Sequence, residues 1–119
     1  MPCWPGCAAR WAHESVDASM ILVLGSVDIR PEHLDQALQL SQEHVTRSRT
    51  EPGCLEHGVH RSHEHPHRLV FVERWADMEA LEAHFRVPAS RQFVKAMAAL
   101  AKAPPAMTLY DATPLPGAL

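Results

Sequence analysis

Residues 20–29 read MILVLGSVDI, and this stretch decides which fold the chain can adopt. Its apolar side chains occur at both parities, with Val23 and Val27 at odd positions and Leu22 and Leu24 at even positions. Because neighbouring residues of a strand point to opposite faces of a sheet, both faces of this strand are apolar. A short apolar run of this kind predicts a buried strand.

The elements that follow this strand can be predicted from the spacing of their apolar residues. These residues recur at helical spacing from Leu34 to Val45, after a proline that suits the first turn of a helix. The sequence EPG at residues 51–53 ends the helix. Residues 54–62 and 67–75 predict two strands joined by a polar turn, which together form a hairpin.

The second half of the chain predicts a helix in two segments and a final strand. Asp77 is expected to cap the first segment, and Ser90 is expected to cap the second after a break at Val87 and Pro88. Residues 106–112 are expected to form the last strand. The order strand, helix, strand, strand, helix, strand is the split βαβ pattern of the ferredoxin-like α+β fold, which has a four-stranded antiparallel sheet.

Apolar residues of both parities also occur in the predicted third strand, where Leu69 and Phe71 alternate with Val70 and Val72. In the ferredoxin-like fold both helices lie on one face of the sheet, so the opposite face of a monomer should be polar. The sheet is expected to have two apolar faces, but helices to cover only one of them. This predicts that a second copy of the sheet covers the other face. We therefore expect a homodimer with a two-fold, sheet-to-sheet contact.

The composition limits the classes of function. A chain of 119 residues with 46% hydrophobic and 21% charged residues and a net charge of -3 is typical of one globular domain. It has no basic patch for nucleic acid and no run of about 20 apolar residues that could cross a membrane. Three cysteines, an odd number, predict a cytoplasmic protein with no disulfide framework. We expect a flexible extension over residues 1–19, a domain over 20–113 and a tail over 114–119.

Five of the nine histidines lie in the sequence HGVHRSHEHPH, a density that metal sites can have. Metal sites need ligands that converge on an ordered backbone, whereas three of these histidines lie in or beside a solvated turn. Alternation along the strand places His60 on the face opposite His57. At most two or three of these histidines could converge, of which the favoured pairs are His60 with His67 and His63 with His65. The sequence therefore favours a solvated loop over a functional metal site.

A second group of residues has surroundings better suited to chemistry. Alternation places Phe71, Glu73 and Trp75 on one face of the third strand, and His84 lies at the edge of the apolar stripe of the next helix. His84 can therefore border the space between helix and sheet, where an imidazole exchanges a proton near neutral pH. The alternative for these residues is purely structural: Trp75 fills the core, Glu73 pairs with an arginine, and His84 borders the core.

Three stretches, EPGCLEH, FVERWADMEALEAHF and RQF, resemble in this order the antibiotic biosynthesis monooxygenase family, in its branch of small quinol monooxygenases. The resemblance runs from about Met20 to Thr113. It implies a dimeric α+β barrel and the oxygenation of a phenolic or hydroquinone substrate by O2, with no metal, flavin, haem or other cofactor. Trp75 matches a tryptophan that family members place in the substrate pocket.

The chain departs from the family at four positions. Phe71 stands where the antibiotic-tailoring enzymes have an asparagine, and Leu81 stands where they have a tyrosine. His57 replaces a tyrosine that family members often have, and Val94 stands near the position of a histidine that haem-degrading relatives use. The resemblance therefore implies a pocket whose hydrogen bonds to oxygen differ from those of the tailoring enzymes, and it disfavours haem oxygenation.

The predicted catalytic residues are Trp75, His84 and His57. His84 or His57 would act as the base that converts the substrate into an electron-rich phenolate, and the indole N–H of Trp75 would stabilise an oxyanion. Glu73 would orient a neighbouring side chain. The predicted substrate-binding residues are Phe71, Glu73, Leu81 and Phe85. The alternative function is a binding protein that holds a small aromatic or quinone ligand and catalyses nothing.

Overall fold

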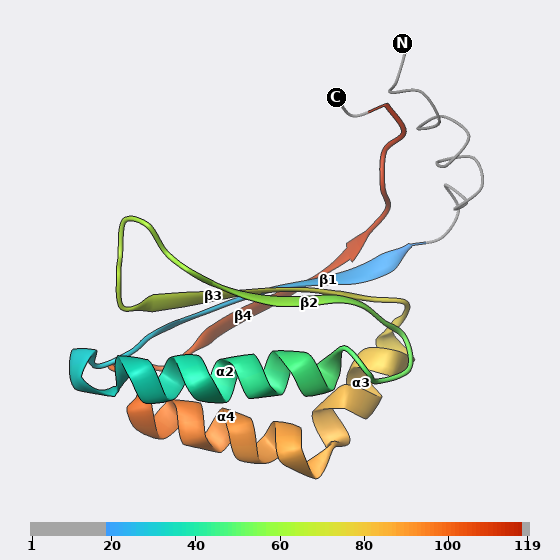
Figure 1. Ribbon diagram of the computed structural model, residues 1–119. Coiled ribbons are helices and arrows are strands. Elements are labelled where there is room, and N and C mark those ends of the chain that lie inside the picture. The colour runs from blue at the N-terminus through green and yellow to red at the C-terminus, as the bar shows by residue number, and fades with distance from the viewer. Residues whose placement is uncertain (1–18, 118–119) are drawn as a thin grey trace.

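The computed structural model describes residues 19–117 as two layers, a sheet and a set of helices (Figure 1). The strands are β1 (Met20–Asp28), β2 (Cys54–Arg61), β3 (Arg68–Trp75) and β4 (Ala106–Ala112). A 3-10 turn, η1 (Pro31–His33), precedes the helices α2 (Leu34–Ser48), α3 (Met78–Arg86) and α4 (Pro88–Leu100). The predicted order of elements and the ferredoxin-like α+β fold are both confirmed.

The four strands form one antiparallel sheet in the order β2-β3-β1-β4. The two strands with apolar residues of both parities, β1 and β3, are therefore the central ones. Helices α2 and α4 lie side by side across one face of this sheet (Figure 1). In the register of the central pair, Val23 lies opposite Glu73 on the face that the helices cover, and Leu24 lies opposite Val72 on the other face.

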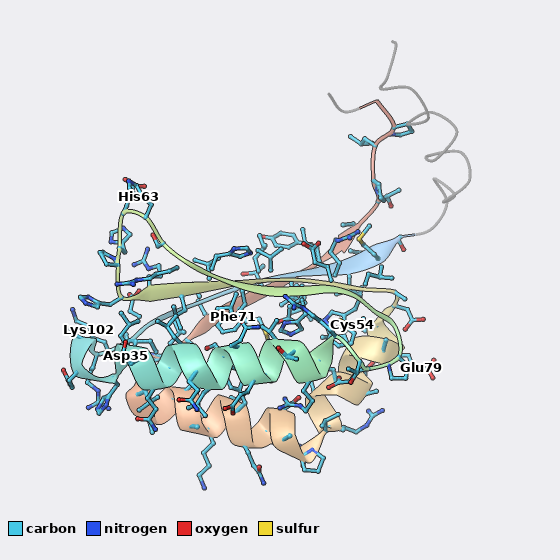
Figure 2. All side chains as sticks on the ribbon, in the orientation of Figure 1. Asp35, Cys54, His63, Phe71, Glu79 and Lys102 are labelled. Atoms are coloured by element: carbon cyan, nitrogen blue, oxygen red, sulfur yellow. The ribbon has the colours of Figure 1, made fainter. Side chains whose placement is uncertain are left out.

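The buried side chains lie between the sheet and the helices, and Figure 2 shows Phe71 in this layer. The larger apolar cluster consists of Val27, Ile29, Leu34, Ala37, Val45, Leu69, Phe71, Met97 and Leu100. A smaller cluster of Val23, Trp75 and Leu81 lies beside α3. Burying one large apolar side chain stabilises a fold by about 1.5–3 kcal/mol, so these clusters hold the helices on the sheet.

The opposite face of the sheet is apolar and carries no helix within the described chain. Leu24 is 41% exposed and Tyr110 of the edge strand β4 is 47% exposed. Val70 and Val72 are half-buried on the same face. Apolar side chains at both parities are thus confirmed for the central strands, with cover on one face only.

The start of the second helical segment differs from the prediction. Ser90 does not cap it, because α4 begins at Pro88 with Val87 as the capping residue and no side-chain hydrogen bond. Proline at the first helical position already has the helical φ and has no N–H to satisfy, so no capping hydroxyl is needed. Ser90 is instead buried inside the helix and accepts a hydrogen bond from Arg47 at 3.3 Å.

Most of the predicted extension over residues 1–19 lies outside the described residues, and the division of the chain at residues 20 and 113 stays a prediction. The tail is described from Pro114 to Gly117. Over residues 19–117 no helix combines the length and the hydropathy that crossing a bilayer requires.

The histidine-rich hairpin turn lies at one end of the sheet, and Figure 2 shows His63 at its tip. His60, His63, His65 and His67 are all exposed. His57 is 2% exposed and lies opposite Glu73, whereas His60 lies opposite Val70 on the other face. The predicted separation of His57 from His60 is confirmed.

Gly53 fixes the turn between α2 and β2, and its replacement should destabilise the fold. Its φ is +82°, and a Cβ built there would lie 2.5 Å from the Cβ of Ala80. We expect Gly53→Ala to lower the free energy of unfolding by more than about 1 kcal/mol, measured by urea titration. Gly117→Ala is the matched control, because Gly117 has a φ of +68° but no atom within 4 Å of the new Cβ. Equal effects of the two substitutions would contradict this account.

Candidate active site

A cleft of about 620 Å³ lies between the sheet and the α3–α4 region, a size typical of sites for small molecules. Its walls are mostly apolar and include Phe71 of β3, Phe85 of α3 and Phe93 of α4. Four buried polar side chains also line it: His44, Glu73, His84 and Ser90. An apolar cavity with a few buried polar groups suits an aromatic ligand whose ring is covered and whose hydroxyl is recognised.

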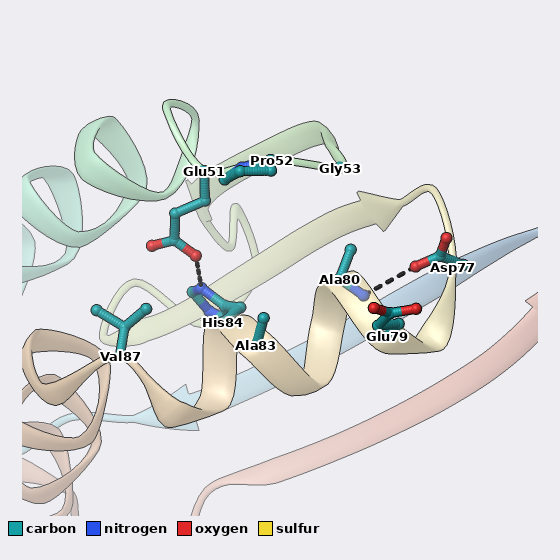
Figure 3. Close-up of a pocket in the computed structure, with 9 residues that line it drawn as sticks. All are labelled: Glu51, Pro52, Gly53, Asp77, Glu79, Ala80, Ala83, His84 and Val87. Atoms are coloured by element: carbon teal, nitrogen blue, oxygen red, sulfur yellow. Dashed lines mark hydrogen bonds and ion pairs between the residues drawn. The ribbon is translucent and has the colours of Figure 1, made fainter.

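His84 reaches the cleft because α3 turns it inward. The side chain of Asp77 caps this helix by accepting a hydrogen bond from the backbone N–H of Ala80 at 2.8 Å (Figure 3). Leu81 and His84 lie about one turn apart on α3, so both side chains point to the same face, into the protein. His84 is 4% exposed. Its Nδ1 lies 2.7 Å from Oε1 of Glu51. A carboxylate can only accept, so Nδ1 holds the proton, and in the neutral ring Nε2 has the lone pair.

Glu73 is a buried carboxylate whose charge is compensated by two neighbours. The indole N–H of Trp75 donates to its Oε1 at 2.9 Å. Nε2 of His57 lies 3.3 Å from the same oxygen but is not aligned for a hydrogen bond, so we treat it as an electrostatic contact. Burial alone raises the pKa of Glu73, but His57 and the bond from Trp75 outweigh burial and hold the pKa below its usual value. Glu73 is thus ionised at neutral pH.

His44 of α2 lies in the same cluster and is held uncharged. Its ring stacks on Phe93, with the centroids 3.9 Å apart and the planes 5° from parallel. Nη2 of Arg47 donates to its Nδ1 at 2.6 Å, because a guanidinium has no acceptor. Burial, followed by the charges of His57, His84 and Arg47, lowers the pKa of His44 to about 3.

His44, His57 and His84 are the only three potential metal ligands that meet within residues 19–117, with one nitrogen of each ring within 4.8 Å of the others. The contact from Arg47 works against a metal there. It occupies the lone pair on Nδ1 of His44, so the proton of this neutral ring lies on Nε2 and the ring has no free lone pair. A guanidinium charge beside the cluster also repels a cation. The arrangement favours proton handling.

A second cavity, of about 390 Å³, is also lined by His84 (Figure 3). Three carboxylates line it: Glu51, Asp77 and Glu79. Glu51 comes from the turn after α2, which Gly53 closes, and the other two come from the start of α3. Among the described residues, His84 alone lines both cavities.

The structure brings four of the predicted site residues to the wall of the larger cleft: Phe71, Glu73, His84 and Phe85. It places the other three behind that wall. Trp75 and Leu81 are fully buried in the small apolar cluster, and His57 is 2% exposed behind Glu73. The N–H of Trp75 is already bonded to Glu73, so it is not available to a substrate oxygen. The indole therefore orients the carboxylate of Glu73.

Sequence reasoning missed His44, Arg47 and Glu51 as site residues. Glu51 belongs to the stretch EPG, which by its sequence predicts only the end of a helix. The sequence contains a pattern that could have identified His44 as a buried residue. It belongs to a stripe of small and polar residues at spacings of four, three and four, all of them buried: Ala37, Ser41, His44 and Ser48. A histidine in such a stripe faces the core.

The family of the chain follows from comparison with known proteins. A family model described as "Antibiotic biosynthesis monooxygenase" matches residues 20–96, which include both the motif of Glu51 and the helix of His84. The chain belongs to the antibiotic biosynthesis monooxygenase family. A monooxygenase-like function is the coarse activity that this family suggests.

Solved structures of similar proteins include one described as an antibiotic biosynthesis monooxygenase, which is 31% identical with a TM-score of 0.74. The match covers 79% of this chain and 99% of that one. The protein Rv0793 of Mycobacterium tuberculosis is 26% identical over 85% of this chain and all of its own, with a TM-score of 0.75. A conserved protein of Methanosarcina mazei, at 21% identity and a TM-score of 0.77 over 81% of this chain and 95% of its own, shows the fold alone.

Among curated proteins, the uncharacterized protein sll1783 of Synechocystis sp. is 29% identical over 90 residues. The match covers 76% of this antibiotic biosynthesis monooxygenase-like chain but only 61% of the relative. This chain thus spans less than two thirds of the length of that protein.

The buried, uncharged His44 should make the fold less stable in acid. The unfolded chain binds a proton on this ring near pH 6.5, whereas the folded chain does so only near pH 3. The free energy of unfolding should therefore fall as the pH is lowered from 6.5 towards 3. His44→Phe keeps an aromatic ring beside Phe93 but removes the titrating group. We expect urea titrations to show that the free energy of unfolding of this variant falls less steeply as the pH is lowered, with a slope smaller by the contribution of up to about one proton.

Phe93→Leu is the control for this measurement, because it removes the stack but keeps the titrating ring and should retain the slope of the wild type. Identical slopes for His44→Phe and the wild type would refute the assignment.

Proposed function

We propose that this protein is a cofactor-independent monooxygenase that oxidises a phenolic or hydroquinone substrate with O2 to a quinone. The observation that carries the proposal is the apolar cleft of about 620 Å³ bordered by a buried imidazole, His84, whose Nδ1 is held by Glu51. Membership of the antibiotic biosynthesis monooxygenase family supports the reaction class.

The chemistry needs a base and a dry pocket. Triplet O2 reacts slowly with closed-shell molecules, but a phenolate can give it one electron and then combine with the resulting superoxide. The peroxide so formed at a ring carbon loses water, so a phenol becomes a quinone with one oxygen atom from O2. A hydroquinone becomes a hydroxyquinone in the same way. The substrate supplies all the electrons, and the protein has to remove a proton and exclude solvent.

We assign the base to His84, because its Nε2 has a lone pair and its ring lines the cleft. His57, the other predicted base, lies behind Glu73 and does not line the cleft. Phe71 and Phe85 provide flat apolar walls. Glu73, ionised and held by Trp75, can accept a hydrogen bond from a second substrate hydroxyl.

Oxygen uptake with a panel of naphthohydroquinones tests the proposal. We expect uptake above the uncatalysed rate and, with labelled O2, one labelled oxygen atom in the hydroxyquinone product. His84→Ala should lower kcat/KM about 100-fold or more, because it removes the general base. His63→Ala, in the exposed hairpin turn, should keep the full rate.

Gly25→Leu is a second test, which probes the cleft itself. Gly25 lines the cleft, and a Cβ there meets only ordinary contacts, of which the shortest is 3.5 Å to the carbonyl of Ala106. Gly25→Ala should therefore be tolerated, while the leucine should occupy the space of the substrate and raise KM. If the quinol binds in the cleft and no oxygen is taken up, the protein is the alternative, a carrier of small aromatic ligands.

We also propose that two copies pack through the sheet face that bears Leu22, Leu24, Val72 and Tyr110. These residues share one face of the sheet, and Leu24 and Tyr110 are 41% and 47% exposed. Covering such an apolar face with the same face of a second copy removes it from water on both sides. The contact would give the dimeric barrel that the resemblance implies.

Sedimentation at micromolar concentration should show a dimer, and Leu24→Arg should shift it to a monomer because two guanidinium groups would be buried at the two-fold contact. The matched control is Val94→Arg, since Val94 is 61% exposed on α4, in the layer opposite the proposed contact. A wild-type protein that sediments as a monomer would rule the contact out.

A further inference from the structure

His84 lines two cavities, of which only the smaller has more than one carboxylate in its lining. The larger cleft is lined by Phe71, Phe85 and Phe93, whereas the smaller one is lined by the carboxylates of Glu51 and Glu79. At 4% exposure the imidazole has little contact with solvent. A proton taken up from the larger cleft therefore needs a route out that does not return through the substrate.

The contacts of Glu51 provide such a route. Its Oε1 accepts the Nδ1 proton of His84 at 2.7 Å (Figure 3). Its Oε2 is buried and has no hydrogen-bond partner among the described residues. Glu51 also lines the smaller cavity, and its side chain is 14% exposed. Glu51 thus contacts the imidazole through Oε1 and borders the cavity that Asp77 and Glu79 also line.

We infer that Glu51 relays the substrate proton from His84 to the acidic cavity between α3 and the α2–β2 turn. The step rests on the proposed function. The phenol proton moves to Nε2 of His84, the Nδ1 proton moves to Glu51, and Glu51 releases a proton to water in the cavity. When the peroxide breaks down, Nε2 returns its proton to the oxygen that leaves as water, while Glu51 takes a proton from water in the cavity and passes it back to Nδ1. Each turnover thus releases one proton through Glu51 and takes one back, which restores the starting state.

The remaining carboxylates of the cavity suit its role as an exit. Asp77 is exposed at the start of α3 and Glu79 is exposed one turn before Ala83. Negative charge around the cavity attracts a proton that leaves Glu51. The larger cleft, by contrast, stays apolar around the substrate, which keeps water away from a radical pair.

Glu51→Gln separates a relay from mere positioning. Glutamine can still accept from Nδ1 of His84 with its carbonyl oxygen, so the ring keeps its orientation, but the amide cannot take the proton. We expect kcat for oxygen uptake to fall at least about tenfold with KM unchanged. We also expect the rate of this variant to rise with added acetate, a small base that can enter the acidic cavity, whereas the wild-type rate should not. Glu82→Gln is the matched control, because Glu82 is exposed on α3, the helix of His84, and lines neither cavity. This variant should match the wild type.

The outcomes are distinguishable. A Glu51→Gln variant as fast as the wild type, or a slow one that acetate does not rescue, overturns the relay and leaves His84 as the base. A His84→Ala variant with the full rate overturns the base assignment and the relay together, whereas a wild-type protein without oxygen uptake overturns the proposed function. If Glu51→Gln does not fold, as judged by circular dichroism, the wild-type rate in mixtures of H2O and D2O decides: a curved dependence supports two protons in transfer, and a linear one overturns the relay.

Discussion

The site is organised by the cost of burying the carboxylate of Glu73 between a sheet and its helices. Strand alternation puts this residue on the covered face of β3, between Phe71 and Trp75, where it is 8% exposed. An ionised carboxylate in such a place needs donors and nearby cations or dipoles. The indole N–H of Trp75 and the ring of His57 meet that need, and both side chains are thereby fixed in the core.

Two carboxylate–histidine contacts result, and their surroundings give them different uses. Glu73 is enclosed by the core, and its contacts leave it as an ionised group at the wall of an apolar cleft. Glu51 lies on a turn and borders a separate acidic cavity, so a proton that reaches it can leave the protein. His44, kept neutral by burial and held by Arg47, fills the space between them without adding charge.

Much of the fold could be predicted because it follows from periodicities that a linear sequence contains. Apolar residues of both parities in residues 20–29 and 67–75 predict strands with two apolar faces, and these are the central strands of the sheet. Helical spacing predicts the helices that cover them. Of the predicted site residues, those that line the cleft are Phe71 and Glu73, which β3 presents on one face, and His84 and Phe85 on α3. His44 and Glu51 were missed because their role depends on elements that lie far apart in the sequence.

The sequence by itself determined the order of elements, the faces of each strand and the polar residues of those faces, because neighbouring residues set these through local backbone geometry. Tertiary structure decided which groups pair. Glu51 and His84 are 33 residues apart and meet only when α3 packs beside the α2–β2 turn. Packing also decided that the indole of Trp75 supports Glu73 from behind the cleft, since a side chain that faces the helices can either line a cavity or fill the core. Which of the two occurs depends on the volume of its neighbours in three dimensions.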